Sequence, residues 1–364
     1  MRVLLVGAGL AGVKVAEGLR EKGYDGELVL IGEETEAPYD RPPLSKQVLR
    51  REKEAFPLVD PELSVNFRPG VSAESLDLSA GQVMTTAGPL PFDQLVIATG
   101  ASPRRLPGAP GLALRTLTDS RALSARLVPG ARLGIVGAGL IGCEVAASAR
   151  SMDVEVSVVD VLDAPLVRVL GPAVAARVQA MHESHGVSFH LGTGVSAASA
   201  KSLELSDGTV LEVDVVLEAM GVTPTVGWLA GSGLDLDDGV VCDPFGRAAD
   251  GVWAAGDVAR WGSGHRHEHW TRACEQANAV AAGILGEPTP VDVAPYWWSD
   301  QYDVKLQGGR DAVARRRRGH ARGRRTGTSA GGLLARRPAD RRGRLLRSRS
   351  RDEAPRSGDV GRHP

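Results

Sequence analysis

The first residues able to do chemistry are Gly7, Gly9 and Gly12, spaced Gly-x-Gly-x-x-Gly after a short apolar run at residues 3–6. Gly7 permits a tight turn, Gly9 lets the backbone approach a pyrophosphate, and Gly12 lets a helix pack closely against a strand. The phosphates would lie at a helix N-terminus, where free N–H groups and the helix dipole favour anions. Glu33, about twenty residues further on, is placed to hold a ribose 2′-OH. The pattern predicts a dinucleotide site.

The same spacing occurs a second time at Gly137, Gly139 and Gly142, and the strand expected after it ends at Asp160. A carboxylate there favours an unmodified ribose and repels a 2′-phosphate. The residues that follow, 161–163, are Val-Leu-Asp and supply no cation for such a phosphate. The second segment therefore predicts a site for NADH, with NADPH less favoured.

Three charged residues outside the glycine turns have two readings each. Arg41 and Lys46 flank Pro42 and Pro43, in a segment expected to be a rigid loop leading into a short helix from Ser45. They either belong to a surface loop or face a cofactor bound at the first glycine turn. Asp257 follows an apolar run and a glycine, so it is either a helix N-cap or a contact to a polar part of the cofactor.

The elements that must position these residues occur twice. Each glycine turn lies between a predicted strand and a predicted helix, and each copy continues into a hairpin and a strand ending in glycine. The segments SLDLSAGQ and DQLVIATGASP in the first half are echoed by SLELSDGT and DVVLEAMGVTP in the second. This duplication predicts an α/β fold with two tandem Rossmann-like dinucleotide-binding domains.

Composition limits the compartment and the kinds of site. At 364 residues with 43% hydrophobic residues, the chain is long enough for two or three domains with proper cores. We expect no signal peptide and no membrane span. The cysteines, Cys143, Cys242 and Cys274, are far apart, which argues against a disulfide framework or a metal site and for a reducing cytoplasm.

Several stretches resemble one family, the FAD-dependent, NADH-using ferredoxin reductases of the putidaredoxin and rhodocoxin reductase type. The resemblance covers about residues 1–307, and its implied fold is the glutathione-reductase-like FAD/NAD fold. Its most specific stretches are PYDRPPLSK and PYWWSDQYDVK. The others are GAGLAG, LVIATGASPRRLPG, GAGLIGCEVAA, VWAAGDVARW and HEHWTRACEQA.

The resemblance implies roles for individual residues. Lys46 and Glu144 resemble the family's ion pair beside flavin N5, where two buried charges are tolerated only together. Trp270 and Trp298 resemble the aromatic residues near the isoalloxazine, although a Trp is more often plain core. The other residues implied to hold FAD are Gly7, Gly9, Gly12, Glu33, Arg41, Val71, Thr99 and Asp257, and those implied to hold NADH are Gly137, Gly139, Gly142 and Asp160.

The implied activity is hydride transfer from NADH to FAD, followed by single-electron transfer to a [2Fe–2S] ferredoxin. That ferredoxin would serve a cytochrome P450 or a ring-hydroxylating oxygenase. Related disulfide reductases need a redox cysteine after Glu33, and this chain has none there; Cys143 is expected to be a small buried hydrophobe. Alternatives are a reductase of rubredoxin or a quinone-like acceptor, or an inactive flavin-binding remnant.

The predicted boundaries divide the chain into four parts. An FAD-binding domain would comprise residues 1–108 and 243–290, with an NAD-binding domain at 109–242. The start of a C-terminal α+β interface domain would be 291–307, with the rest of that domain truncated or scrambled in the Arg-rich tail, residues 308–364.

The tail differs from the rest of the chain in composition. It holds 18 Arg against 5 acidic residues, whereas residues 1–307 hold 25 basic against 39 acidic residues. With no aromatic residue and no apolar periodicity it is predicted not to fold. A shift of reading frame near residue 307 in a GC-rich gene is favoured over a selected nucleic-acid-binding tail, because selected basic tails usually mix Lys with Arg.

Overall fold

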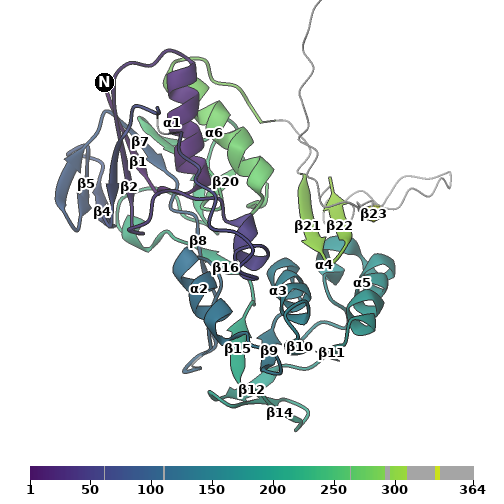
Figure 1. The fold of residues 1–364 in the computed structure, drawn as a ribbon. Helices are drawn as coiled ribbons and strands as arrows, with labels where there is room; N and C mark the ends of the chain where they lie inside the picture. Colours follow the sequence, from purple (N-terminus) through teal and green to yellow (C-terminus); the bar gives the residue numbers. More distant parts are fainter. Residues whose placement is uncertain (61, 110, 263, 292–295, 310–332, 337–364) are drawn as a thin grey trace, which may run out of the picture.

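The computed structural model describes the chain except for residues 61, 110, 263, 292–295, 310–332 and 337–364. Two α/β units follow one another, with a small sheet beside the second (Figure 1). In the described part of the chain, no helix has the length and apolar character to cross a membrane.

The first unit is built on a six-stranded sheet. Strands β1, β2, β7 and β19 run parallel, β3 adds a parallel edge, and β18 closes the other edge antiparallel. Its elements in the first part of the chain are β1 (Arg2–Val6), α1 (Leu10–Glu21), β2 (Glu27–Gly32), η1 (Pro42–Ser45), β3 (Asn66–Pro69), β4 (Ala73–Asp77), β5 (Gln82–Thr85), β6 (Gly88–Pro91), β7 (Gln94–Ile97) and β8 (Ala101–Pro103).

The second unit is built on a four-stranded, wholly parallel sheet in the order β11-β10-β9-β15. Its elements are α2 (Leu117–Arg126), β9 (Arg132–Val136), α3 (Leu140–Arg150), β10 (Glu155–Asp160), α4 (Val167–Leu170), α5 (Pro172–Ser184), β11 (Val187–Leu191), β12 (Val195–Ala198), β13 (Ser202–Leu205), β14 (Val210–Glu212), β15 (Val215–Glu218) and β16 (Val222–Pro224).

The chain then returns to the first sheet. Strand β19 pairs with β7, so segments before and after the second unit share one sheet. The elements of this return are η2 (Gly227–Leu229), β17 (Val240–Cys242), β18 (Arg247–Ala249), β19 (Val252–Ala254), β20 (Ala259–Trp261) and α6 (Trp270–Ile284). Helices α1 and α6 lie side by side on one face of the sheet (Figure 1). The domain boundaries given above stay a prediction.

The duplication seen in the sequence is present in three dimensions. Each unit places a strand–turn–helix beside a neighbouring parallel strand, β1 with β2 and β9 with β10. Each also carries a three-stranded antiparallel sheet, β4-β5-β6 in the first unit and β12-β13-β14 in the second. The α/β fold with two Rossmann-like units is therefore observed.

The cores explain why short apolar runs suffice for the central strands. In β1, Val3 and Leu5 pack toward α1 and α6, while Leu4 and Val6 pack on the opposite face of the sheet. A strand covered on both faces needs an unbroken apolar run, because successive side chains point to opposite sides. Burying each such leucine stabilises the fold by about 1.5–3 kcal/mol.

After α6 the chain forms a small antiparallel sheet of β21 (Trp297–Gln301), β22 (Val304–Gly308) and β23 (Leu333–Arg336). Strand β23 lies within the Arg-rich tail, and the prediction that this tail does not fold around a core of its own stays a prediction. The open edge of β22 supplies backbone partners, and a strand can form there without a core of its own. The remainder of the tail, and with it the frameshift and nucleic-acid hypotheses, lies outside the described residues apart from Gly308 and Gly309.

The segment after Arg41 differs from the expectation. The prediction of a short helix from Ser45 is wrong, because the helical turn is the 3₁₀ element η1, with prolines in its first two positions. Proline has no N–H to lose there, and its fixed φ suits a first turn. Lys46 is the first residue after this turn, so the turn sets the direction in which the Lys46 side chain points.

Candidate functional site

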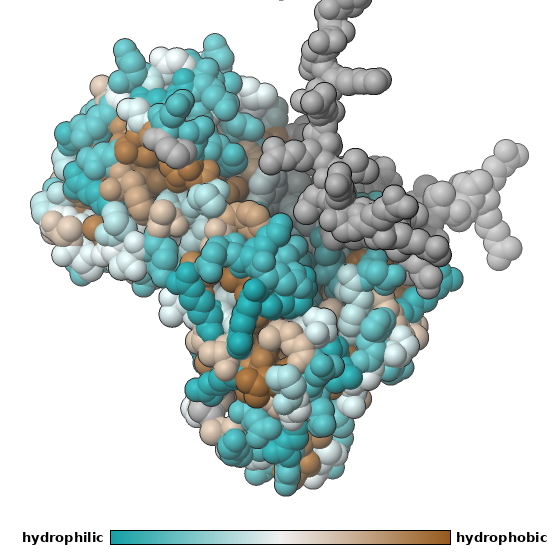
Figure 2. Space-filling model, in the orientation of Figure 1, coloured by the Kyte–Doolittle hydropathy of each residue, from teal (hydrophilic) through white to brown (hydrophobic). Residues whose placement is uncertain are grey.

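A cavity of about 800 Å³ extends from the first glycine turn to the first turn of α3 and to β21. Its volume lies in the range of small-molecule and cofactor sites. Most of the residues predicted for the FAD site line it. They are Gly7, Gly9, Glu33, Arg41, Lys46, Val71, Thr99, Glu144, Asp257, Trp270 and Trp298. Figure 2 shows the outer surface around these units as mainly hydrophilic, with apolar residues gathered in patches.

The first glycine turn has the geometry that its spacing predicts. Gly7 has a φ of +114°, and a Cβ there would meet the carbonyl oxygen of Ala98 at 2.2 Å. A Cβ on Gly12 would meet the carbonyl oxygen of Gly7 at 2.1 Å, so α1 can pack this closely against the turn only if residue 12 is glycine. Nothing lies within 4 Å of a Cβ on Gly9. The backbone is therefore open at Gly9, where α1 begins without a side-chain cap.

The second glycine turn repeats this geometry. Gly137 has a φ of +111°, and a Cβ on Gly142 would meet its carbonyl oxygen at 2.0 Å. Gly139 again has no neighbour within 4 Å of a Cβ, and it precedes α3, which also lacks a side-chain cap. These glycines do not line the cavity, but Leu140 and Ile141 of the first turn of α3 do.

Both turns fit the pyrophosphate of a dinucleotide. Each presents an open glycine and uncapped N–H groups at a helix start, which favour an anion. The first turn opens into a cavity of the size that FAD needs, and the cavity reaches the start of the helix that follows the second turn. The residues present therefore fit FAD at the first turn and a nicotinamide dinucleotide at the second.

Asp160 occupies a different place from Glu33, because Asp160 is the last residue of the second strand of its unit, whereas Glu33 is the first residue after its strand. In the strand registers Val6 faces Ile31 and Val136 faces Val159. Gly32 is thus the counterpart of Asp160, and Val161 that of Glu33. The sequence prediction treated the two acids as equivalent, and the register shifts them by one residue.

Packing explains the shift. A Cβ on Gly32 would lie 2.6 Å from the Cβ of Ala8, so the first turn leaves no room for a side chain there. In the second unit the Asp160 carboxylate accepts hydrogen bonds from the backbone N–H of Ala138 at 2.7 Å and of Leu162 at 2.9 Å. Asp160 therefore holds the second glycine turn in place, and its contact with a ribose stays a prediction.

Lys46 and Glu144 form a buried ion pair on the cavity wall. Lys46 Nζ lies 2.5 Å from Glu144 Oε2, and the two residues are 8% and 5% exposed. The same carboxylate oxygen accepts a hydrogen bond from the Ser45 hydroxyl at 2.6 Å, and Oε1 accepts one from the Ser299 hydroxyl at 2.6 Å. Paired charges with their lone pairs satisfied are the form in which buried ions are tolerated.

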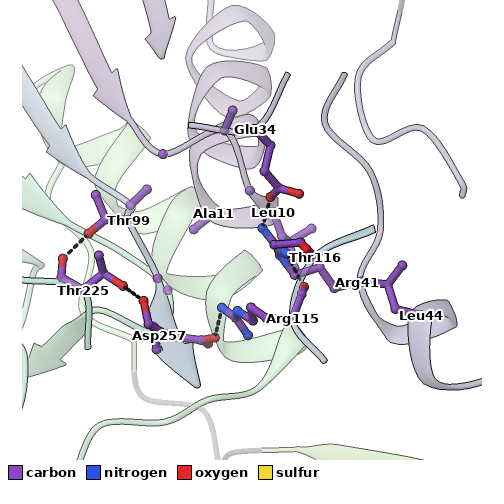
Figure 3. Close-up of a pocket in the computed structure, with 18 of the residues that line it drawn as sticks. Leu10, Ala11, Glu34, Arg41, Leu44, Thr99, Arg115, Thr116, Thr225 and Asp257 are labelled. Carbon is purple, nitrogen blue, oxygen red and sulfur yellow. Dashed lines mark hydrogen bonds and ion pairs between the residues drawn. The ribbon is translucent and has the colours of Figure 1, made fainter. Parts of the chain in front are cut away.

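Arg41 contacts protein groups at the cavity edge. Its guanidinium pairs with Glu34 at 2.7 Å and also donates to the carbonyl oxygen of Arg115 (Figure 3). Tyr39 donates its hydroxyl to Glu34, and burial raises the pKa of this tyrosine. Arg41 therefore helps to fix the loop, and Glu34 and Arg115 are cavity residues that the sequence analysis missed.

Asp257 does not cap a helix. Helix α6 begins at Trp270, with His269 at its N-cap, so the N-cap reading of Asp257 is wrong. Asp257 instead pairs with Arg115 at 2.9 Å across the cavity (Figure 3). Asp257 lies between β19 and β20, so strand β20 separates it in sequence from the start of α6, and its carboxylate lines the cavity.

The remaining predicted residues line the same space from several elements. Thr99 follows β7 and donates its hydroxyl to the backbone oxygen of Thr225 at 2.8 Å (Figure 3). Val71 precedes β4, and its backbone N–H bonds to Gly32 at 2.9 Å. Trp270 and Trp298 meet edge to face with centroids 6.0 Å apart. The Trp270 indole N–H donates to Asp40 at 2.9 Å.

Other cavity residues had weaker signals in the sequence. Glu268 lines the cavity and pairs with Arg266 at 2.8 Å, and burial raises its pKa. Ser45 and Ser299 lie inside the two most specific motifs, PYDRPPLSK and PYWWSDQYDVK, but nothing in their own residue type pointed to Glu144. Only the meeting of distant segments reveals them.

The cysteines have the environment of unreactive thiols. Cys143 is fully buried in α3, as expected, and burial raises its pKa. Burial also raises the pKa of Cys242 to about 12 and of Cys274 to about 11. Thiols are nucleophiles and redox groups mainly as thiolates, so these three residues lack the required activation.

Comparison with known proteins identifies the family. Residues 1–277 match the model of the pyridine nucleotide-disulphide oxidoreductase family. The chain is 36% identical over 334 residues to the ferredoxin–NAD(+) reductase component of the p-cumate 2,3-dioxygenase system of Pseudomonas putida, covering 87% of this chain and 83% of the relative. It is 34% identical to putidaredoxin reductase of Pseudomonas putida, covering 84% and 79% of the two chains.

Solved structures agree with these relatives. The crystal structure of Fdr9 superposes with a TM-score of 0.80 at 41% identity, covering 85% of this chain and 83% of the other. The covalent putidaredoxin reductase–putidaredoxin complex gives a TM-score of 0.80 at 34% identity, covering 85% and 81%. The fold is thus the FAD/NAD-binding fold of the glutathione-reductase-like superfamily. The chain belongs to the pyridine nucleotide-disulphide oxidoreductase family, whose members bind FAD and a nicotinamide dinucleotide, and it is similar to the ferredoxin reductases of cytochrome P450 and dioxygenase systems.

Proposed function

We propose that this chain is an FAD-dependent NADH:ferredoxin oxidoreductase. It would take a hydride from NADH and pass single electrons to a [2Fe–2S] ferredoxin that feeds a cytochrome P450 or a ring-hydroxylating oxygenase. The observation that carries the proposal is the continuity of one cavity. It begins at Gly9, open for a pyrophosphate, and ends at Leu140 and Glu144, directly after the second glycine turn.

When bound, FAD accepts a hydride from a nicotinamide and releases electrons one at a time. The residues of this chain bind and orient the two reactants. Gly9 and Gly139 would let the backbone approach the two pyrophosphates, and Glu33 and Asp160 would face the two riboses. Holding two reacting groups in register removes much of the entropic cost of their encounter.

Lys46 and Glu144 would act on the reaction through the electrostatic field of their fixed charges, and neither would donate or accept a proton. Lys46 Nζ is bound by Glu144, and it also donates to the Pro42 carbonyl oxygen at 3.2 Å and to the Ser45 hydroxyl at 3.3 Å. An ammonium held by three acceptors keeps its position. Such preorganised charges in a water-poor site stabilise developing charge without rearrangement.

Trp270 and Trp298 would form the wall on the acceptor side of the cavity. Tyr296, 37% exposed, stacks on Trp298 with ring centroids 6.2 Å apart. The aromatic residues therefore extend from the cavity to the surface, which supports an acceptor outside the protein. The relatives named for putidaredoxin and for dioxygenase ferredoxins favour an iron–sulfur protein as that acceptor.

A visible absorption spectrum of the purified 364-residue chain, recorded before and after anaerobic addition of NADH, tests this function. We expect flavin absorbance that NADH bleaches. A colourless protein, or a flavin that NADH leaves oxidised, would contradict the proposal.

The acceptor is tested separately by steady-state turnover with a [2Fe–2S] ferredoxin, a rubredoxin and a quinone. Faster reduction of the ferredoxin is expected. Faster reduction of either other acceptor would support the alternatives raised by the sequence. The cytoplasmic location inferred from the dispersed cysteines stays a prediction.

A further inference from the structure

A chain of buried hydrogen bonds leads away from Glu144 into the β21–β22 hairpin and helix α5. The Ser299 hydroxyl lies 2.6 Å from Glu144 Oε1, and Gln301 Nε2 lies 3.1 Å from Ser299 Oγ. Gln301 Oε1 is 2.8 Å from His182 Nε2, and the Tyr302 hydroxyl is 3.1 Å from His182 Nδ1. Ser299, Gln301 and His182 are each 0% exposed.

The charge of Glu144 dictates the direction of every bond in this chain. A carboxylate paired with an ammonium can only accept hydrogen bonds. Ser299 must therefore donate its proton to Glu144, and its oxygen is left to accept from the amide N–H of Gln301. The amide oxygen of Gln301 then faces His182 Nε2.

The same argument fixes the donor and the acceptor in the remaining hydrogen bonds, as far as Tyr302. Because Gln301 presents its oxygen, Nε2 of His182 must carry the hydrogen. Nδ1 is then unprotonated and accepts from Tyr302. The opposite direction would place a hydroxyl lone pair against Glu144 Oε1 at 2.6 Å in a buried site, where an unpaired charge is costly.

His182 is held neutral, so its tautomer can be observed at neutral pH. Burial and, to a smaller extent, the nearby His185 lower its pKa to about 4, opposed only partly by the bond to Gln301. The other ring groups around it are Phe189, edge-on at 6.0 Å, and Tyr302, which stacks on His185. A neutral imidazole has one N–H, and here its position reports the direction of the whole chain.

We propose that Ser299 and Gln301 are positioning residues for Glu144, and that the charge of Glu144 fixes His182 as the Nε2–H tautomer. The positioning role rests on the proposed function, since it matters only if Glu144 lies beside a reacting flavin. The tautomer does not depend on that function. The β21–β22 hairpin thus lines the cavity and also donates a hydrogen bond, from Ser299, to the Lys46–Glu144 ion pair.

If Glu144 is replaced by glutamine, we expect donor and acceptor to exchange roles in every hydrogen bond from Ser299 to His182. Lys46 and Ser45 still require an acceptor where Oε2 was, so the new amide must place its N–H₂ toward Ser299. Ser299 would then donate to a flipped Gln301, whose N–H₂ would donate to His182 Nε2. His182 would become the Nδ1–H tautomer.

Nitrogen NMR of the full chain labelled with ¹⁵N-histidine measures this directly, with His182 assigned from a His182→Gln spectrum. We expect Nε2–H in the wild type and Nδ1–H in Glu144→Gln. The matched control is Glu183→Gln, an exposed glutamate next to His182 on α5, which should leave the tautomer unchanged. Nδ1–H in the wild type, or no change in Glu144→Gln, would overturn the proposal.

A double-mutant cycle tests positioning. We expect Ser299→Ala to slow the bleaching of flavin by NADH by about tenfold or more, since small misplacements of reacting groups can cost up to about 10²-fold. In a Glu144→Gln background the same change should have little further effect. Equal slowing in both backgrounds would mean that Ser299 acts only on the fold, and would refute positioning.

The two proposals fail differently. If NADH reduces no flavin even in the wild type, the proposed function is wrong. The tautomer measurement needs no NADH, and it would still decide whether the charge of Glu144 sets the direction of the chain.

Discussion

Lys46 and Glu144 lie 98 residues apart in sequence, and their side chains meet 2.5 Å apart on the wall of one cavity. Lys46 follows the η1 turn of the first unit, and Glu144 lies one turn into α3 of the second. The pair therefore joins the two dinucleotide-binding units at the place where the two cofactors would meet.

Breaking this pair should affect stability and chemistry separately. We expect Lys46→Met to lower the free energy of unfolding by about 3–5 kcal/mol, because Glu144 would be left as an uncompensated buried charge. The double variant Lys46→Met/Glu144→Leu should recover most of that stability and yet reduce flavin slowly. Urea unfolding and stopped-flow reduction by NADH check the two effects. A double variant as unstable as the single one would contradict the argument.

Substitutions at the two open glycines, Gly9 and Gly139, should each affect the binding of a different cofactor. Gly9 and Gly139 have ordinary negative φ and free space at the Cβ position, so alanine should be accepted without backbone strain. We expect Gly9→Ala to lose bound flavin on gel filtration. Gly139→Ala should keep flavin and raise the KM for NADH about tenfold, equivalent to about 1.4 kcal/mol.

The control for this pair is Gly12→Ala, whose Cβ would meet the Gly7 carbonyl oxygen at 2.1 Å. It should be destabilised with or without cofactor. Loss of flavin in Gly139→Ala, with Gly9→Ala unaffected, would reverse the assignment of the two sites.

Cofactor choice should depend on Val161 as well as Asp160. Asp160 also accepts bonds from the second glycine turn, so Asp160→Ala should weaken turnover with both cofactors, but less with NADPH, because the repulsion of the 2′-phosphate is lost as well. Val161 is 66% exposed and lies one residue further along. We expect Val161→Arg to raise kcat/KM for NADPH about five- to tenfold by supplying a cation for the 2′-phosphate. No gain with NADPH would place the ribose elsewhere.

His182 should make stability depend on pH. Its folded pKa of about 4 lies below the unfolded value near 6.5, so the unfolded chain binds more protons between those values. The contribution is fully present above pH 6.5 and is lost as the pH falls toward 4. Between pH 7 and 5 we expect a loss of about 2 kcal/mol.

Urea midpoints of the wild type and of His182→Gln at pH 7 and pH 5 measure this loss, which should be absent in the variant. His190→Gln, a half-buried histidine on β11 outside this chain of hydrogen bonds, is the matched control and should keep the wild-type dependence. An unchanged pH dependence in His182→Gln would show that other groups cause it.

The sequence by itself determined the two glycine turns and the strands beside them. Gly12 and Gly142 are required by contacts within one strand–turn–helix, and Gly7 and Gly137 by the positive φ of the turn itself, so this geometry follows from spacing. The apolar runs of β1 and β9 likewise identify strands covered on both faces. The α/β fold and the duplicated units follow from these local signals alone.

Only the tertiary structure decided which side chains meet. The Asp257–Arg115 pair, the one-residue shift between Asp160 and Glu33, and the hydrogen bonds of Ser299 and Gln301 join segments far apart in the chain. The spacing of residues along the sequence does not predict such contacts, because they depend on loop lengths and on the register of the sheet. The direction of the bonds from Glu144 to His182 depends on a buried charge whose partner, Lys46, only the fold brings within reach.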